Sequence, residues 1–487
     1  MRYVIGIDIG TTNTKAVAIA PDGVVLATTS AGYAAFSDAD GRHELDPDHL
    51  MGAVRESLAG VVRQVDPAPE GIGFSCAFHS LLAVDESGKP MTRAMTWADL
   101  RPAAEAKALK ATEAGMRIYR HTGTPLHAMS PLCKLLWLRA RQPQVFGRAA
   151  RFIGIKEYIW WRLFGRYEID HSIASATGLF DIRGLDWYGE SLELAGITPS
   201  RLSSPVPCTH QGRGLLPGVL AGIADRVPFI IGGGDGCLAN LGSGAIRPGD
   251  TALTIGTSGA IRMTARTPED DSKGRIFTYI MSPGRYACGG ATNNGGNVLK
   301  WLFEKILGVE DEQEWEGRVE AAAELAPGCE GLICLPYLQG ERAPVWDAEA
   351  RGVFFGLRSI HDHRHFIRAC LEGVCYSLCE IGASLEETIG PIADIYASGG
   401  FTRSETWVQM LADIFDKNVH VSHAADASAA GAAILAMLAL GQIPDTDAAT
   451  GLVKVRKTYE PDPARHVLYR KNYEVFTQLY SRLRDLE

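Results

Sequence analysis

The chain has 487 residues, of which 46% are hydrophobic and 22% charged, and its formal net charge at pH 7 is -9. A single hydrophobic core stops growing at roughly 250 to 300 residues, so we expect two domains of similar size. The acidic balance and the lack of any Lys/Arg run exclude the basic surface that nucleic-acid binding needs, so no nucleic-acid partner is expected.

The pattern also argues against a membrane segment and against a secreted fold. The longest apolar stretch runs from Ala429 to Gly441, short of the roughly 20 residues needed to cross a bilayer, so we expect a buried helix there. The first strand carries an acid, Asp8, and no small-residue cleavage site follows it, so we expect no signal peptide. Ten cysteines without a C-x-x-C pair indicate reduced, mostly buried thiols. We therefore expect a cytoplasmic protein without a membrane partner.

Turn residues and hydrophobic periodicity predict a mixture of strands and helices in the first half of the chain. The expected elements are an antiparallel meander over residues 3–9, 14–20 and 24–30, a helix over 47–65, a strand over 72–75, a helix-rich stretch over 102–163 and a strand over 227–231.

One short hairpin sequence occurs twice, about half a chain length apart. Ile9-Gly10-Thr11-Thr12 is echoed by Ile255-Gly256-Thr257-Ser258, and each copy follows a β-rich run and precedes another. A repeat of this length indicates two related α/β domains, each with one glycine–threonine hairpin. We place the boundary near residue 245, which predicts one domain over 1–245 and a second over 246–487.

The first hairpin has the composition of a triphosphate-binding loop. Glycine lets the backbone approach a phosphate, amides and hydroxyls donate to it, Lys15 adds positive charge, and Asp8 is suited to hold a hydrated Mg²⁺. The donors in question are Gly10, Thr11, Thr12 and Asn13. A plain turn uses the same residue types, but an acid at the end of an apolar strand is costly to bury without a metal or partner. Neither a G-x-x-x-x-G-K-[ST] loop nor a G-x-G-x-x-G motif after a strand occurs.

A second acid, Asp235, follows a buried strand and three glycines, Gly232, Gly233 and Gly234. Glycines leave room for an acceptor molecule beside the carboxylate, which is the arrangement that a general base for phosphoryl transfer needs. Capping of the following helix is the alternative role, and the two roles are compatible.

These residues resemble the FGGY carbohydrate kinases, which belong to the actin-like ATPase superfamily, over nearly the whole chain. The resemblance implies an α/β fold of two duplicated ribonuclease-H-like domains with ATP bound in the cleft between them. It implies sugar binding and catalysis in the domain over 1–245, nucleotide binding in the domain over 246–487, and ATP with Mg²⁺ as cofactors. Asp235 matches the base of that family, and Asp8 is the expected metal ligand.

The resemblance also assigns nucleotide-binding residues beyond the first hairpin. The second hairpin contributes Gly256 and Thr257, and it has Thr254 where the first has Asp8. A strand over 394–398 is expected to lead into the adenosine motif. The remaining nucleotide-binding residues implied in this way are Gly296, Lys300, Gly400 and Ser404.

The acceptor site is implied to lie in the first domain. The segment Phe78-His79-Ser80 occupies the place of a Met-His pair in xylulose kinases, and Trp97, Asp99 and Arg101 match a W-x-D-x-R signature. His79 is expected to bind a substrate hydroxyl, although a lone histidine is more often structural. The alternative for Asp99 and Arg101 is that they pair with each other.

Three stretches are most similar to the gluconate kinases of the family: 78–85, 127–135, and 155–158 with 172–178. The Arg-Glu pair of glycerol kinases is absent at Phe78-His79. We therefore expect D-gluconate to be phosphorylated to 6-phospho-D-gluconate. A carboxylate calls for charge-assisted hydrogen bonds, for which Lys156, Arg101 and His127 are unranked candidates. Kinases for xylulose or another pentulose or deoxysugar are the alternative.

Two readings from other classes stay open: a non-catalytic sugar sensor and an ATPase that serves a protein partner. The oligomeric state is open as well, including a homodimer. Glu341 and Arg342 are as readily a structural ion pair as part of a site. The histidines of the segment His361-Asp362-His363-Arg364-His365 are expected to start a polar helix rather than hold a metal.

Overall fold

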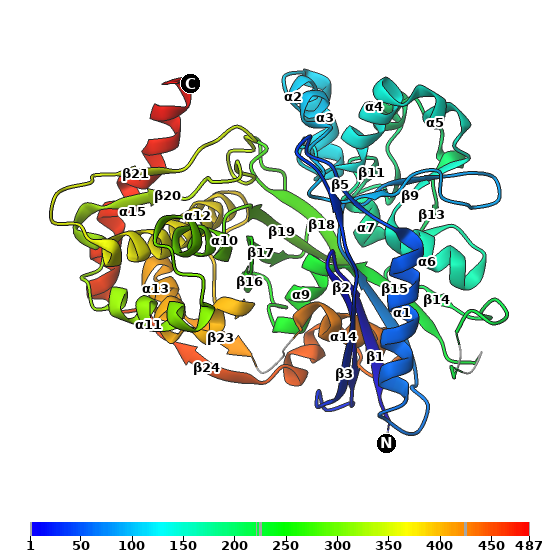
Figure 1. Cartoon of the computed structure of the whole chain (residues 1–487). Helices are drawn as coiled ribbons and strands as arrows, with labels where there is room; N and C mark the ends of the chain where they lie inside the picture. Colours follow the sequence, from blue (N-terminus) through cyan, green and yellow to red (C-terminus); the bar gives the residue numbers. More distant parts are fainter. Residues whose placement is uncertain (1, 221, 224–225, 423–425, 487) are drawn as a thin grey trace. The chain divides into compact units, whose positions relative to one another are not determined.

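The computed structural model describes residues 2–220, 222–223, 226–422 and 426–486 (Figure 1). The chain forms two compact units. Unit 1 comprises Met1–Arg247, Thr264–Cys288 and Ala424–Lys454, and unit 2 comprises Pro248–Met263, Gly289–His423 and Val455–Glu487. Two segments from the second half of the chain thus belong to unit 1. The division into 1–245 for sugar binding and 246–487 for nucleotide binding stays a proposal.

Unit 1 is built on a six-stranded sheet in the order β14-β15-β6-β1-β2-β3. Its strands are β1 (Val4–Ile9), β2 (Asn13–Ile19), β3 (Val25–Gly32), β6 (Ile72–Cys76), β14 (Gln211–Gly212) and β15 (Phe229–Gly234). The first three form the expected antiparallel meander, whereas β1, β6 and β15 run parallel to one another. The carboxyl ends of these three parallel strands therefore lie along one edge of the sheet.

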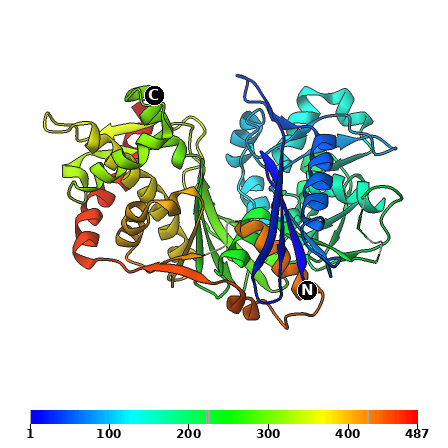
Figure 2. The same ribbon diagram turned by 60° about the horizontal axis from the view of Figure 1, so that its bottom comes forward.

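Two helices from distant parts of the chain pack on this sheet. They are α1 (Pro47–Val62) and α14 (Ala427–Ala439), and α14 lies against β1 (Figure 2). The approach of α14 is close because glycine faces it: a Cβ on Gly6 would lie 1.9 Å from the carbonyl oxygen of Ala429, and one on Gly73 would lie 2.2 Å from that of Ala432. The buried helix expected over the alanine-rich stretch is confirmed. None of the described helices is both long and apolar enough to span a membrane.

Smaller elements complete unit 1. The helices are α2 (Ala103–Lys110), α3 (Glu113–Thr122), α4 (Pro131–Arg141), α5 (Pro143–Arg148), α6 (Ile155–Phe164), α7 (His171–Ser175), α8 (Gly189–Ala195), α9 (Asp235–Ser243), η1 (Pro199–Arg201) and η5 (Asp447–Leu452). The strands are β4 (Phe36–Ser37), β5 (His43–Leu45), β7 (Leu82–Val84), β8 (Ala94–Met95), β9 (Arg151–Ile153), β10 (Glu168–Asp170), β11 (Phe180–Asp181), β12 (Asp186–Trp187), β13 (Ser204–Val206) and β18 (Phe277–Ser282).

Unit 2 repeats the strand pattern of unit 1. Strand β16 (Thr251–Ile255) forms an antiparallel hairpin with β17 (Gly259–Ala265) and pairs in parallel with β22 (Ile395–Ser398), which pairs in parallel with β23 (Val419–Ser422). With β24 (Val455–Tyr459), these strands have the order β17-β16-β22-β23-β24, which matches the order β2-β1-β6-β15-β14 in unit 1. The repeat first suggested by two glycine–threonine hairpins is therefore a repeat of topology.

The other elements named for the second half are β19 (Arg285–Thr292), β20 (Ile333–Leu335), β21 (Val353–Phe355), β24 (Val455–Tyr459), α10 (Gly296–Trp301), η2 (Leu302–Ile306), α11 (Glu312–Ala323), η3 (Cys329–Gly331), α12 (His363–Thr388), η4 (Gly400–Arg403), α13 (Glu405–Phe415), α15 (Pro463–Leu483) and η6 (Arg484–Leu486). The chain passes from one unit to the other within β17 and β19. Helix α12 starts at the histidine cluster with Asp362 as its N-cap, and the described residues contain no group of metal-ligating side chains. The expected polar helix start is confirmed.

Candidate active site

A row of polar residues crosses the sheet of unit 1 near the carboxyl ends of β1, β6 and β15. Asp8 of β1 stands opposite Lys15 of β2 and Ser75 of β6, and Ser75 stands opposite Gly233 of β15. The hydroxyl of Ser75 donates to Oδ1 of Asp8 at 2.6 Å. The loops that follow β1, β6 and β15 carry the first hairpin, residues 78–80 and Asp235. Strand polarity alone therefore brings three of the sequence-predicted groups to one edge.

Asp8 lies in an acidic environment. Burial, together with the nearby carboxylates of Asp426 and Asp235, raises the pKa of its carboxyl to about 8, against the opposing effects of Ser75 and Lys15. When no cation is bound, ionising this buried carboxyl is costly; a cation beside it would stabilise the ionised form. The donor set therefore fits a Mg²⁺ ion held by one carboxylate, water and phosphate oxygens, which is the usual manner for this ion.

Lys15 is bound to an acid that comes from the other end of the chain. Its Nζ lies 2.8 Å from Oδ2 of Asp426, whose side chain is 11% exposed. Asp426 is also the N-cap of α14 and accepts from the backbone N–H of Ala429. The lysine of the first hairpin is thus held in place by the start of α14.

Asp235 follows three glycines, two of which have no room for a side chain. Gly232 has φ 74°, and a Cβ there would lie 1.7 Å from the carbonyl oxygen of Phe74. A Cβ on Gly234 would lie 2.0 Å from the ring of Phe78. Asp235 is the first residue of α9, and its Oδ1 accepts from the backbone N–H of Gly236 at 2.7 Å. The N-cap is Gly234, which has no side chain, so Asp235 is not the capping residue.

His79 is held in a strained and specific orientation. Its φ is 67°, unusual for a residue with a side chain. Its Nδ1 lies 2.8 Å from the carbonyl oxygen of Ala176, which can only accept, so Nδ1 carries a proton. Nε2 lies 3.4 Å from the hydroxyl of Tyr279. The side chain is 8% exposed, and the rings of Phe78 and Tyr279 pack against it. The structure thus orients His79 through Ala176 and Tyr279.

Ser80 and His127 are tied to neighbouring backbone. Oγ of Ser80 accepts from the backbone N–H of Ile155, the first residue of α6, at 2.9 Å. Nδ1 of His127 accepts from the backbone N–H of Met129 at 3.2 Å, which places the proton of the neutral ring on Nε2. Ser80 therefore links the loop after β6 to α6.

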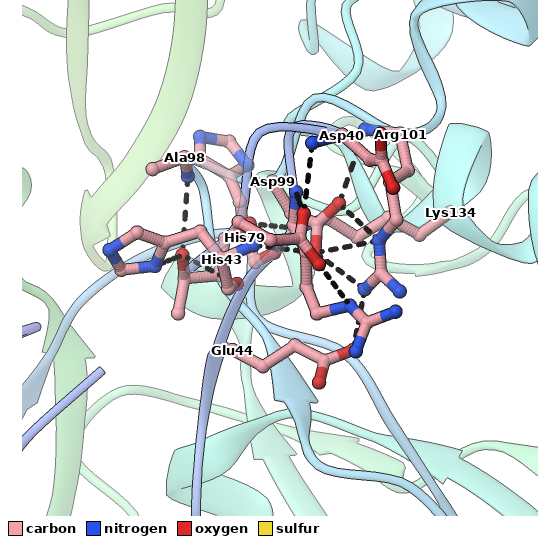
Figure 3. A network of polar contacts seen from close by, with 11 residues as sticks. Asp40, His43, Glu44, His79, Ala98, Asp99, Arg101 and Lys134 are labelled. Atoms are coloured by element: carbon pink, nitrogen blue, oxygen red, sulfur yellow. Dashed lines mark hydrogen bonds and ion pairs between the residues drawn. The ribbon is translucent and has the colours of Figure 1, made fainter. Parts of the chain in front are cut away.

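Asp99 and Arg101 pair with each other, the alternative that the sequence left open. The guanidinium of Arg101 donates to both carboxylate oxygens of Asp99 and, at 2.5 Å, to Glu44 (Figure 3). Asp99 is fully buried and also accepts from the backbone N–H of His43. Trp97 is partly exposed beside this network. The pairing supports a role for Asp99 and Arg101 in holding the segment 97–101 against His43 and Glu44.

Lys156 is also committed to protein groups. Its side chain is 3% exposed, and its Nζ lies 2.6 Å from Oδ2 of Asp170 and donates to the carbonyl oxygen of Gly233 at 2.9 Å. Because the ammonium of Lys156 contacts Asp170 and Gly233, its position supports a role in holding β15 more than direct contact with a substrate carboxylate.

In unit 2 the second hairpin is packed against the turn that precedes α10. The backbone N–H of Gly296 donates to the carbonyl oxygen of Gly256 at 2.8 Å, and that of Gly295 donates to the carbonyl oxygen of Thr257 at 3.2 Å. A Cβ on Gly295 would lie 2.7 Å from the backbone of Ser258. The structure therefore brings Gly256, Thr257 and Gly296 together through backbone contacts, and a side chain at Gly295 would clash with them.

The other nucleotide candidates of unit 2 lie on different elements. Gly400 starts η4 directly after β22 and Gly399. Ser404 is the N-cap of α13 and accepts from the backbone N–H of Trp407. Lys300 of α10 is exposed, with an ion pair to Glu304 at 3.5 Å.

Glu341 was considered as half of a structural pair with Arg342. It is 1% exposed and accepts from Thr292, Asn294 and two backbone N–H groups, while Arg342 donates to the carbonyl oxygen of Thr292. These contacts knit β19 to the loop around residue 341, which agrees with a structural role.

Sequence reasoning missed three residues of the site: Asp426, Ser428 and Tyr279. Oγ of Ser428 donates to the carbonyl oxygen of Asp235 at 3.1 Å, so the start of α14 touches both Lys15 and Asp235. The signal for Asp426 was an acid just before an alanine-rich helix, a typical N-cap pattern. No local signal marks Tyr279, because its partner His79 is distant in sequence.

The fold and this edge together define a two-unit nucleotide-dependent phosphotransferase of the actin-like, ribonuclease-H-like class. The pattern of the N-terminal domain of the FGGY family of carbohydrate kinases matches residues 3–242, and that of the C-terminal domain matches residues 251–440. The chain belongs to this family.

Individual proteins show the same similarity over nearly full length. A gluconokinase of Bacillus licheniformis is 42% identical over 98% of this chain and 95% of its own. The crystal structure of a gluconate kinase from Lactobacillus acidophilus has a TM-score of 0.95 and 33% identity over 99% of this chain and 98% of its own. A ligand-bound xylulose kinase from Lactobacillus acidophilus has a TM-score of 0.94 and 33% identity over the same shares.

Proposed function

We propose that this protein transfers the γ-phosphoryl group of Mg·ATP to a hydroxyl of D-gluconate, giving 6-phospho-D-gluconate. The observation that carries the chemistry is the common edge of the parallel strands β1, β6 and β15, where Asp8 lies near the end of β1 and His79 and Asp235 follow β6 and β15. The substrate rests on the identity of 42% to a gluconokinase, which exceeds the 33% to a xylulose kinase.

Asp235 is the proposed general base. Its carboxylate accepts the proton of the attacking hydroxyl while the hydroxyl oxygen forms a bond to the γ-phosphorus and the bond to the β,γ-bridging oxygen breaks, so that ADP leaves with that oxygen. Phosphoryl transfer asks a protein chiefly for positioning and charge stabilisation. Gly232 and Gly234 let β15 pack closely on Phe74 and Phe78, which fixes the place of Asp235, and Lys15 supplies positive charge in the first hairpin.

Asp8 is the proposed Mg²⁺ ligand, and the ion when bound neutralises charge on the phosphates. Gly10, Thr11, Thr12 and Asn13 of the first hairpin are proposed phosphate donors. The proposed nucleotide-binding residues of unit 2 are Gly256, Thr257, Gly296, Lys300, Gly400 and Ser404. For Ser404 the helix cap leaves its second lone pair and its proton for a ligand.

Acceptor binding is assigned to Phe78, His79, Ser80, Trp97 and His127. With a proton on Nδ1 held by Ala176, neutral His79 has its acceptor at Nε2, which lies 3.4 Å from the hydroxyl of Tyr279, whereas His127 carries its proton on Nε2. His127 is proposed as a hydrogen-bond donor to the substrate carboxylate, and Arg101 and Lys156 form ion pairs within the protein.

The test is ADP release with Mg·ATP across D-gluconate, D-xylulose, L-ribulose, glycerol and L-fuculose, with Asp235→Asn as the matched variant. We expect turnover with gluconate, reduced about 10²- to 10⁴-fold in Asp235→Asn while sugar binding measured by calorimetry is retained. Turnover with xylulose alone would keep the mechanism and replace the substrate. Binding without turnover of any acceptor would establish a sensor instead.

Location and assembly are further proposals. A kinase that consumes ATP works where ATP is made, so we propose a cytoplasmic enzyme. A homodimer is the assembly to test first, by light scattering at two protein concentrations.

A further inference from the structure

A buried ion pair joins two segments of unit 1 beneath the proposed base. Lys156 on α6 and Asp170 at the end of β10 are 3% and 0% exposed, with Nζ and Oδ2 2.6 Å apart. Oδ1 of Asp170 accepts from the backbone N–H of Ile173 as the N-cap of α7. Asp170 is therefore held by its role as a helix cap, and Lys156, in the first turn of α6, is held by its contact with Asp170.

The pair contacts the last two residues of β15. The register between β15 and β6 shifts between Ile230 and Gly233, and pairing resumes with Gly233 opposite Ser75 and Gly234 opposite Cys76. Strand β14 pairs only with Phe229 and Ile230. Beyond it, Nζ of Lys156 donates to the carbonyl oxygen of Gly233 at 2.9 Å, and Oγ of Ser172 accepts from the backbone N–H of Gly234 at 3.1 Å. Side chains thus bind backbone groups of the two residues that precede Asp235.

The same helix is tied to the acceptor loop. The backbone N–H of Ile155, the neighbour of Lys156, donates to Oγ of Ser80 at 2.9 Å. Phe78 of that loop packs against Gly234, where a Cβ would lie 2.0 Å from the ring. A short path of contacts therefore runs from the residues 78–80 through the start of α6 to Asp235.

We propose that Lys156, paired with Asp170, is a positioning residue that holds the carbonyl of Gly233 and so sets Asp235 relative to the acceptor loop. This inference rests on the proposed function for its kinetic consequence. A misplacement of about 1 Å of a reacting group costs about 10²-fold in rate, so a lysine that touches no substrate is able to control the chemical step. If Lys156 instead bound a substrate carboxylate directly, its loss would chiefly raise KM for the sugar.

The test compares Lys156→Met, Asp170→Asn and the double variant Lys156→Met/Asp170→Asn. Asparagine keeps the N-cap of α7, and the double variant leaves no unpaired buried charge, which protects folding. We expect Lys156→Met and the double variant to lower kcat about 10- to 100-fold with KM for ATP and sugar within about threefold. Hydrogen–deuterium exchange of the segment 229–236 is expected to rise in the same two proteins.

The control is the double variant Arg368→Met/Glu372→Gln, which removes another buried ion pair, with Nε and Oε1 2.8 Å apart and side chains 5% and 1% exposed, in unit 2. It is expected to keep wild-type kcat and wild-type exchange over 229–236. Recovery of wild-type kcat in the Lys156→Met/Asp170→Asn protein would overturn the proposal, as would normal exchange in Lys156→Met, or raised exchange with unchanged kcat. Because exchange is measured without substrate, failure of the wild-type enzyme on every sugar would refute the proposed function separately.

Discussion

The ammonium group of Lys15 and the carboxylate of Asp426 form an ion pair of 2.8 Å between the second strand of the chain and the start of α14. Ser428, two residues further on, donates to the carbonyl oxygen of Asp235. The N-terminus of α14 therefore touches both the first hairpin and the strand end that carries the proposed base. The start of α14, which lies late in the sequence, thus contacts site residues from the first half of the chain.

Asp426→Asn is expected to weaken ATP use. Asparagine retains the cap of α14, so the change removes only the charge that holds Lys15. A lysine released from its partner samples more rotamers, and we expect KM for ATP to rise about 3- to 10-fold with little change in melting temperature. Steady-state kinetics and thermal unfolding measure the two effects.

The matched control is Asp462→Asn, which alters the N-cap of α15 in unit 2 and leaves Lys15 untouched. An unchanged KM for ATP in Asp426→Asn would show that Lys15 needs no anchor.

Gly232→Ala is expected to destabilise the fold. Its positive φ and the contact of 1.7 Å that a Cβ would make with the carbonyl oxygen of Phe74 leave no room for a side chain. We expect a loss of more than about 2 kcal/mol in the free energy of unfolding, with loss of activity in the folded fraction. Urea unfolding measures it. Gly52→Ala is the control, because a Cβ there meets nothing within 4 Å in the middle of α1; it should gain about 0.5–1 kcal/mol. Equal stability of the two variants would contradict the steric argument.

Glu157 should make stability depend on pH. Burial raises the pKa of its carboxyl from 4.5 to about 7, against hydrogen bonds that include one of 2.6 Å from the backbone N–H of Gly154. Between these values the unfolded chain has lost the proton and the folded protein keeps it, so stability falls as pH rises through this window and levels off above about 7. The drop is at most about 3 kcal/mol.

Glu157→Gln still offers Gly154 an acceptor and cannot ionise, so it should lack this part of the drop. Urea unfolding at pH 5 and pH 8 compares it with wild type and with Glu56→Gln, an exposed residue of α1 that should behave as wild type. A drop of the same size in Glu157→Gln would refute the assignment.

Asp8→Asn should change the metal requirement. If Asp8 holds Mg²⁺, chelation by EDTA abolishes wild-type turnover, and the variant needs about 10-fold or more Mg²⁺ for half-maximal rate with a lower kcat. A Mg²⁺ titration at fixed ATP measures both. Asp22→Asn, in the exposed turn between β2 and β3, should titrate as wild type does. Identical titrations for Asp8→Asn would move the metal ligand elsewhere.

Much of the site was predictable because its signals are local. A glycine–threonine hairpin after an apolar strand, and Asp235 after three glycines, are patterns of neighbouring residues, and the topology places both at strand ends as expected. The repeat of Ile9–Thr12 at Ile255–Ser258 likewise becomes two hairpins of matching topology, with Asp8 beside Ser75 in one and Thr254 beside Ser398 in the other.

The roles of charged side chains were not predictable in this way. Arg101 and Lys156 were both candidates to clamp a substrate carboxylate, yet each is paired with an acid of the protein. Whether a cation is free for a ligand depends on which acid lies within about 4 Å, and a sequence does not record that distance.

The amino-acid sequence by itself determined the class of fold, the two glycine–threonine hairpins and the acid at the end of β15, because hydrophobic period and glycine placement act over a few residues. Only the tertiary structure decided that α14 belongs to unit 1, that Asp426 holds Lys15, that Tyr279 faces His79 and that Lys156 grips β15. These contacts join residues far apart along the chain, and they are selected by the packing of whole elements and not by local propensity.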